Sequence, residues 1–120
     1  MLSKIEPSTF NGCESLREIT IPSSVIVICK NAFSGCSSLT EVNIPSSVLI
    51  IDDYAFSYCT SLERIDLPSS LSIIGNSAFY NCEQLHSFHL PSSLKKLGKC
   101  AFCNCYSILY VNIPESLDKL

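Results

Sequence analysis

One unit repeats at a fixed period along the whole chain, and this period limits the possible folds more than any other feature of the sequence. The full units are 13–35, 36–58, 59–81 and 82–104, with partial units at 1–12 and 105–120. Stacked units bury an apolar face that one unit cannot bury alone, so such a period predicts a solenoid, here a single repeat domain over residues 1–120. Neither end carries the polar terminal unit that closes most solenoids, so we expect a segment of a longer array.

Each unit begins with a predicted short strand that a proline ends. In unit 36–58, Val42 and Ile44 lie two residues apart with a polar residue between them, which is typical of a strand with one buried face. Pro45 follows, and the strand ends there because proline cannot donate a ladder hydrogen bond. Two residues later stands Ser47, whose hydroxyl we expect to bond backbone groups within the bend. This serine recurs as Ser24, Ser47, Ser70, Ser93 and Ser116.

The second half of each unit returns to the core and predicts a short helical turn. Val48 and Ile51 are apolar and form the return to the core. The remaining segment carries the apolar columns of Ala55 and Phe56, which recur in the other units. Their spacings suit a helical or 3₁₀ turn better than a strand. Strands of successive units would pair in parallel about 4.8 Å apart. The predicted fold class is an α/β solenoid, with a parallel β-sheet on the concave face and short helical or 3₁₀ turns on the convex face.

The motifs of the unit carry a resemblance to a known family. The segment LTEVNIPSSV, which begins at Leu39, shows the pattern LxxLxLPxS. With the 23-residue period, the IG-x-x-AF segment and the C-x-x-L restart, the chain resembles the BspA-like leucine-rich repeat family over nearly its whole length. Many other leucine-rich repeats carry Asn or Cys where this chain has its recurrent second serine. The resemblance implies a right-handed leucine-rich repeat superhelix that binds proteins. Family members include bacterial and protozoan surface antigens implicated in adhesion to host or matrix proteins.

Eight cysteines are present, and five of them occupy one column, once in every repeat. We interpret this column as small, buried and reduced side chains. Its members are Cys13, Cys36, Cys59, Cys82 and Cys105. Cys29, Cys100 and Cys103 lie outside it, and they are candidates for reactive thiols, bridged or free. Cys100-x-x-Cys103-x-Cys105 resembles a metal motif, but the register predicts that these side chains diverge around a helical turn, which disfavours zinc.

The charge pattern and the missing motifs argue against several function classes. The chain has 8 Lys and Arg against 11 Asp and Glu, and these charges are scattered. A nucleic-acid-binding face or a polybasic membrane anchor needs them clustered, and no apolar run is long enough for membrane insertion. GxSxG, Walker, HExxH and dinucleotide motifs are all missing, so we expect neither an enzyme nor a cofactor. His86 and His89 have no further histidine to complete a zinc site, so a metal is disfavoured there too.

The candidate binding surface consists of strand positions that face solvent between the buried columns. The candidate protein-binding residues are Glu18, Glu41, Arg64, Asp66, His89 and Tyr110. Tyr and Arg are favoured at interface hot spots. The repeat places Glu41 beside Arg64, where the two can pair, and Glu18 beside Glu41 as a like-charge neighbour. Solvated positions of no function would vary in the same way, so both interpretations stay open.

The predicted function is a protein–protein interaction module. By resemblance it would be a surface antigen or adhesin whose unidentified partner is a host or matrix protein. The alternative is a structural spacer of a longer array, or an intracellular scaffold, without a ligand of its own. End-to-end self-association through uncapped ends fits both. Two localisations also stay open. The resemblance implies a cell surface, whereas unpaired cysteines and the absence of an export signal indicate a reducing interior of the cell.

Overall fold

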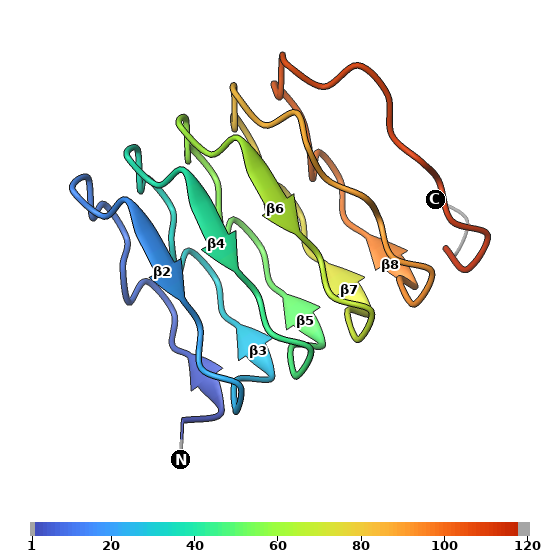
Figure 1. Ribbon diagram of the computed structural model, residues 1–120, viewed down its shortest axis with the longest axis horizontal. Helices are drawn as coiled ribbons and strands as arrows, with labels where there is room; N and C mark the ends of the chain where they lie inside the picture. The colour runs from blue at the N-terminus through green and yellow to red at the C-terminus, as the bar shows by residue number, and fades with distance from the viewer. Residues whose placement is uncertain (1, 118–120) are drawn as a thin grey trace.

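Every strand pairs in parallel with the equivalent segment of a neighbouring repeat. The computed structural model describes residues 2–117. One sheet contains β2 (Glu18–Thr20), β4 (Glu41–Asn43) and β6 (Arg64–Asp66). Within it, Ile19 pairs with Val42 and Val42 pairs with Ile65, the register that the repeat predicts. The predicted solenoid with a parallel sheet along one side is therefore confirmed (Figure 1).

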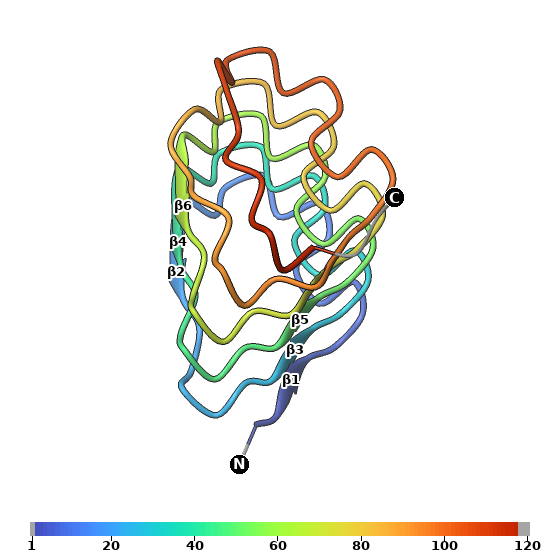
Figure 2. The same cartoon turned by 90° about the vertical axis from the view of Figure 1, so that its right-hand side faces the viewer.

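A second parallel sheet runs along the solenoid, and the sequence interpretation missed it. Its strands are β1 (Lys4–Ile5), β3 (Val27–Ile28), β5 (Ile50–Ile51), β7 (Ile73–Ile74) and β8 (Lys96–Leu97), in that order. Each repeat forms one turn of the solenoid, which we call a coil. Seen end-on, the two sheets lie on different sides of the coil (Figure 2). The apolar return after the bend, for which the sequence predicted no secondary structure, is thus a strand. Its Ile and Val residues have high strand propensity, and the second residue of β3, β5 and β7 is buried.

The helical turns expected on the convex side are not formed, and no residue of 2–117 is helical. Backbone N–H groups alternate here between their own coil and the next one. Ser34 N–H donates to Asn31 O at 3.2 Å within the coil, whereas Phe33 N–H donates to Ala55 O at 2.8 Å in the next. Asn31 and Gly35 have φ of 59° and 77°, left-handed values that interrupt a right-handed helix. The segment is therefore a chain of β-turns that also joins neighbouring coils.

Phenylalanine rings stack through the core, one from each coil. Ring centroids are 5.1 Å apart for Phe10–Phe33 and for Phe33–Phe56, 5.4 Å for Phe56–Phe79 and 5.2 Å for Phe79–Phe102. All four pairs lie within 9° of parallel. The three central rings are fully buried. This column makes each interior coil depend on a neighbour on both sides, as the repeat predicts.

The recurrent serine bonds the neighbouring coil rather than its own bend. The hydroxyls of Ser70, Ser93 and Ser116 donate to backbone carbonyls of the preceding coil, at 2.6 to 2.7 Å, and Ser24 makes the same bond to Leu2 O. Ser47 alone departs from this pattern, because its buried hydroxyl has no partner within residues 2–117. These serine hydroxyls, which we call the hydroxyl ladder, thus join neighbouring coils. The sequence interpretation had placed their hydrogen bonds inside the bend.

Candidate functional site

Three of the predicted binding residues lie side by side on the sheet of β2, β4 and β6. Glu18 pairs in register with Glu41, and Glu41 with Arg64. All three are exposed. We define the strand face as the exposed side chains of β2, β4 and β6 together with those of segments 86–89 and 107–112, which continue the same columns. The sequence predicted this face to be concave.

The expected ion pair between Glu41 and Arg64 is not formed. Arg64 Nη2 instead lies 3.6 Å from Asp66 Oδ1, two residues along the same strand. Both side chains are well exposed, at 59% and 78%, so the pair stabilises the fold by at most about 1 kcal/mol. It is the only ion pair within residues 2–117. Among the residues that the structure describes, Glu18 and Glu41 are consequently neighbouring carboxylates without a cationic partner, which makes this end of the strand face acidic.

The sheet opens after β6, at Phe88. Beyond β6 a single bridge remains, between Arg64 and Ser87, with Ile65 N–H donating to Ser87 O at 3.0 Å. No further strand of this sheet is formed within the described residues. Phe88 stands in the column that holds Ile19, Val42 and Ile65 in earlier coils, and it stacks on Phe102 at 4.7 Å. The ladder therefore ends in the coil where an aromatic ring replaces the aliphatic side chain of this column.

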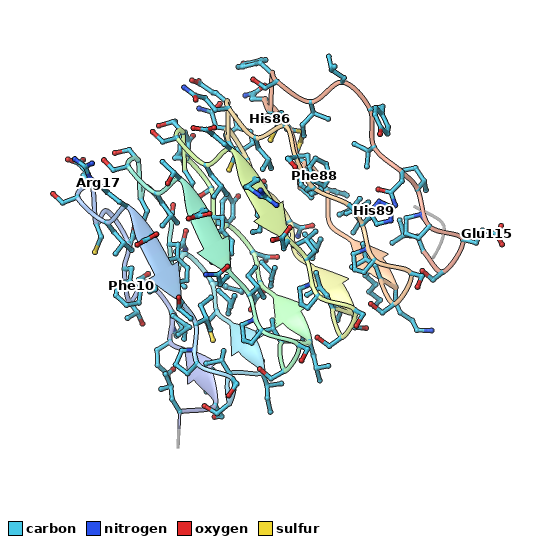
Figure 3. All side chains as sticks on the ribbon, in the orientation of Figure 1. Phe10, Arg17, His86, Phe88, His89 and Glu115 are labelled. Atoms are coloured by element: carbon cyan, nitrogen blue, oxygen red, sulfur yellow. A yellow bond between two sulfur atoms is a disulfide. The ribbon has the colours of Figure 1, made fainter. Side chains whose placement is uncertain are left out.

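Two hollows flank Phe88 on the strand face. The first, of about 540 Å³, lies between β6 and segment 87–92 and is lined by Asp66, Phe88 and His89 among others. The second, of about 300 Å³, lies between segments 86–89 and 107–112 and is lined by His86, His89 and Tyr110 among others. Figure 3 shows His86, Phe88 and His89 close together at this end of the molecule. Asp66 thus lines the first hollow and Tyr110 the second, and His89 borders both.

The last described coil leaves the sheet, and this changes the setting of Tyr110. In Figure 2, the red segment that follows Cys105 runs inside the outline of the preceding coils. Here the side chain of Asn112, rather than backbone pairing of strands, binds the backbone of Leu90 in the preceding coil. Leu90 N–H donates to Asn112 Oδ1 at 3.0 Å, and Asn112 Nδ2 donates to Leu90 O at 2.9 Å. Tyr110 is 85% exposed. The expectation that His89 and Tyr110 stand on regular strands is therefore wrong.

Sequence reasoning missed Asn112, which shapes the second hollow. Its Nδ2 lies 3.4 Å from His89 Nε2, so it contacts both the backbone and a hollow-lining side chain. Its column in the repeat otherwise holds Thr20, Asn43, Asp66 and His89, all polar and solvent-facing. Nothing in that pattern distinguishes Asn112, because its role depends on where the last coil leaves the sheet.

The cysteine column is a buried hydrogen-bonded ladder. Four of its members lie in the core, and Cys13 is half-buried. The Sγ atom of each buried member donates to a phenylalanine carbonyl 26 residues earlier: Cys36 to Phe10 O and Cys59 to Phe33 O at 3.2 Å, and Cys82 to Phe56 O and Cys105 to Phe79 O at 3.1 Å. Burial raises the pKa of the Cys36 thiol to about 11. The expectation of buried, reduced side chains is confirmed for these four members, whereas Cys13 is reduced but only half-buried.

The expectation for the Cys-x-x-Cys motif is wrong. Cys100 and Cys103 do not diverge but form a disulfide, with Cα atoms 4.6 Å apart. A β-turn brings residues three apart within bonding reach, and Cys103 N–H donates to Cys100 O at 3.2 Å across this one. Among residues 2–117 no group of three or more His, Cys, Asp and Glu side chains converges as metal ligands would.

The family follows from this geometry and from comparison with known proteins. A family model described as "BspA type Leucine rich repeat region" matches six copies over residues 3–120. The chain belongs to the BspA-type leucine-rich repeat family. Comparison with curated protein sequences gives no significant match. None of the residues in 2–117 forms a helix of the length and hydropathy that crossing a bilayer requires.

Solved structures of other leucine-rich repeat proteins share this fold. The T. pallidum leucine-rich repeat protein TpLRR is 36% identical, with a TM-score of 0.92, over 94% of this chain and 53% of its own. A leucine-rich repeat protein from Bacteroides ovatus is 33% identical, with a TM-score of 0.73, over 97% and 36%. The pneumococcal vaccine antigen PcpA is 26% identical, with a TM-score of 0.76, over 97% and 37%. This chain therefore spans about half of TpLRR and little more than a third of the other two.

Proposed function

We propose that this BspA-type repeat is a protein-binding module that holds its partner on the strand face, at the two hollows beside His89. The observation that carries the proposal is the opening of the sheet at Phe88. A further hollow, of about 330 Å³, lies on the regular part of the strand face beside Glu41 and Arg64. The two hollows beside Phe88 differ from it because aromatic and imidazole side chains border them. Side chains of these types near a concave feature favour specific contacts with another protein.

The charges and the exposed apolar side chains indicate what the partner segment carries. Glu18 and Glu41 present unpaired carboxylates along one end of the strand face, so basic side chains complement them. At the other end Leu109 and Tyr110 are 95% and 85% exposed, which favours apolar contacts. We therefore propose an extended partner segment with basic residues towards β2 and apolar residues towards Tyr110.

A role as a surface antigen or adhesin is the finer form of this proposal. One similar protein of known structure is named as a vaccine antigen, and that protein is only 26% identical to this chain. The supporting argument is the shared repeat, and the partner class would then be a host or matrix protein. A spacer without a ligand is the competing function, supported by the regularity of the first four coils.

The test compares two tyrosines that differ in position. Binding of the chain to immobilised matrix proteins is measured with Tyr110→Ala, Asp66→Ala and the control Tyr54→Ala. Tyr54 is also exposed, at 46%, but it lies in the convex turns. We expect Tyr110→Ala to weaken binding at least tenfold, since hot-spot truncations cost about 2 kcal/mol or more, and Tyr54→Ala to leave it unchanged. Equal loss in both variants would contradict the strand face as the site, and saturable binding to none of the proteins would favour the spacer.

A further inference from the structure

Two of the eight cysteines differ from the rest in their chemistry. Four thiols of the cysteine column are buried, with Sγ atoms that donate to phenylalanine carbonyls. Cys29 is buried too, and desolvation raises the pKa of its thiol. The reactive form of cysteine is the thiolate, so these side chains are poor nucleophiles. By contrast, Cys100 is exposed and Cys103 half-buried, and they share a disulfide.

The turn that holds Cys100 and Cys103 does not depend on their bond. The same turn recurs in the other coils without cysteine, where Ser34 N–H donates to Asn31 O at 3.2 Å and Tyr80 N–H donates to Ser77 O at 3.1 Å. The first residue of each has a positive φ, 59° at Asn31, 54° at Ser77 and 55° at Cys100. Asn81 N–H also donates to Cys103 O at 2.8 Å from the previous coil. Reduced thiols would therefore stay within reach of each other.

The surroundings of the pair favour thiol–disulfide exchange. Lys99 directly precedes Cys100, and Lys95 and Lys96 lie earlier in the same coil, all three exposed. Neighbouring lysines favour the thiolate form that exchange requires. The exposed position of Cys100 gives an attacking thiol access to one sulfur of the bond.

An aromatic contact connects this turn with the strand face. Phe102 lies inside the four-residue loop that the disulfide closes. Its ring stacks on Phe79 at 5.2 Å in the core column and on Phe88 at 4.7 Å, with the latter planes 12° apart. Phe88 borders both hollows. A change in the position of Phe102 is thus passed by direct contact to the wall of the hollows.

We propose that Cys100 and Cys103 form a reversible exchange site for an external dithiol, and that Phe102 and Phe88 transmit its redox state to the hollows of the strand face. A thiolate of the dithiol attacks Cys100 Sγ, the bond to Cys103 Sγ breaks, and Cys103 leaves as a thiolate. The second thiol of the reagent then displaces Cys100 from the mixed disulfide. The dithiol is oxidised to a disulfide, and its two electrons and two protons reduce Cys100 and Cys103 to thiols.

The first experiment tests the exchange site. The folded chain is treated with dithiothreitol, alkylated without denaturant and mapped by mass spectrometry, beside an untreated sample. We expect Cys100 and Cys103 to be alkylated only after reduction, and to be protected again after reoxidation, while Cys59 stays unmodified throughout. Alkylation of Cys100 and Cys103 without reduction, or resistance to reduction until the chain is unfolded, would overturn the exchange site.

The second experiment tests the transmission and needs no binding partner. The chain has two histidines, His86 and His89, and both border the second hollow. Their imidazole NMR signals therefore report on the Phe88 ring. We expect both signals to shift on reduction of the native chain, and not in the Cys100→Ser, Cys103→Ser double variant. Phe102→Leu keeps the disulfide but should reduce the shift at least twofold.

The outcomes separate this proposal from the proposed function. Unchanged histidine signals in the reduced native chain would overturn the transmission, and an undiminished shift in Phe102→Leu would overturn the path through Phe102. Redox-dependent signals in a chain that binds no protein would contradict the proposed function while supporting the exchange site. Binding that is unaffected by Tyr110→Ala likewise leaves both redox experiments valid.

Discussion

Replacing Phe56 by Ala is the sharpest test of the stacked core. Phe56 is fully buried and lies between Phe33 at 5.1 Å and Phe79 at 5.4 Å, so its removal opens a cavity that contacts both neighbouring coils. Buried Phe→Ala substitutions cost about 3–5 kcal/mol. A domain of this kind is stable by about 5–15 kcal/mol, so the variant should lose a large part of its stability.

The matched variant is Phe10→Ala, in the same column at the first coil. Phe10 is half-buried and stacks on Phe33 alone, at 5.1 Å. Because Phe10 is less buried than Phe56 and has one stacking neighbour instead of two, Phe10→Ala should lower the free energy of unfolding by about 2 kcal/mol. Phe56→Leu keeps apolar volume and should cost about 1 kcal/mol. The central position should therefore be about twice as sensitive as the terminal one.

Urea denaturation followed by far-ultraviolet circular dichroism measures these differences. With a slope of about 2 kcal/mol per molar urea, Phe56→Ala should lower the midpoint by about 2 M and Phe10→Ala by about 1 M. A decrease in the slope of Phe56→Ala would indicate that the coils on either side unfold separately. Equal losses at Phe10 and Phe56, or a loss below about 1 kcal/mol at Phe56, would refute the reasoning that the column couples each coil to two neighbours.

Three further predictions concern single contacts between coils. Ser70→Ala should lower the free energy of unfolding by about 1 kcal/mol in urea denaturation, because its hydroxyl donates to Val48 O at 2.7 Å. Ser47→Ala should lower it less, because that hydroxyl has no partner among the described residues, and a reversed order would contradict the hydroxyl ladder. Asn112→Leu should lose about 1–3 kcal/mol and broaden the NMR signals of the last coil, since Leu90 N–H and O lose both partners, and unchanged stability would show that this contact is dispensable. Burial raises the pKa of Cys36 from its usual 9.0 to about 11, so the folded chain keeps a proton that the unfolded chain releases; its contribution is complete below about pH 9 and is lost as the pH rises to about 11. The thermal midpoint of Cys36→Ala should therefore fall less steeply over this range than that of the native chain, and parallel curves would argue against it.

The candidate site was predictable from the sequence only in part. The repeat identified which columns face solvent, and Glu18, Glu41 and Arg64 do lie side by side. It could not show that Arg64 turns to Asp66, because a long side chain chooses among neighbours at similar distance. The gathering of Asp66, His89 and Tyr110 around two hollows depends on a departure from the repeat. Whether these residues bind a protein stays a prediction.

The sequence by itself determined the solenoid, its register and most of its core. A fixed period places each residue beside its own copy, so columns such as Phe33, Phe56 and Phe79 are stacked once the coils close. The repeat gives only the shift from one coil to the next, so these predictions need no knowledge of the backbone path within one coil. The second sheet and the chain of β-turns required that path, because their hydrogen bonds depend on φ values that the residue types do not reveal at Ser8, Tyr54 or Cys100.

The tertiary structure alone decided the features that make one end of the solenoid different. Phe88 stands where the ladder of β2, β4 and β6 ends, and its ring meets Phe102 from the other side of the coil, with 4.7 Å between the two ring centroids. Cys100 and Cys103 meet because the turn between them is tight rather than helical. In both cases two side chains with no shared column come into contact, and a repeat predicts only contacts within columns. The proposed binding site and the proposed exchange site both arise at such contacts.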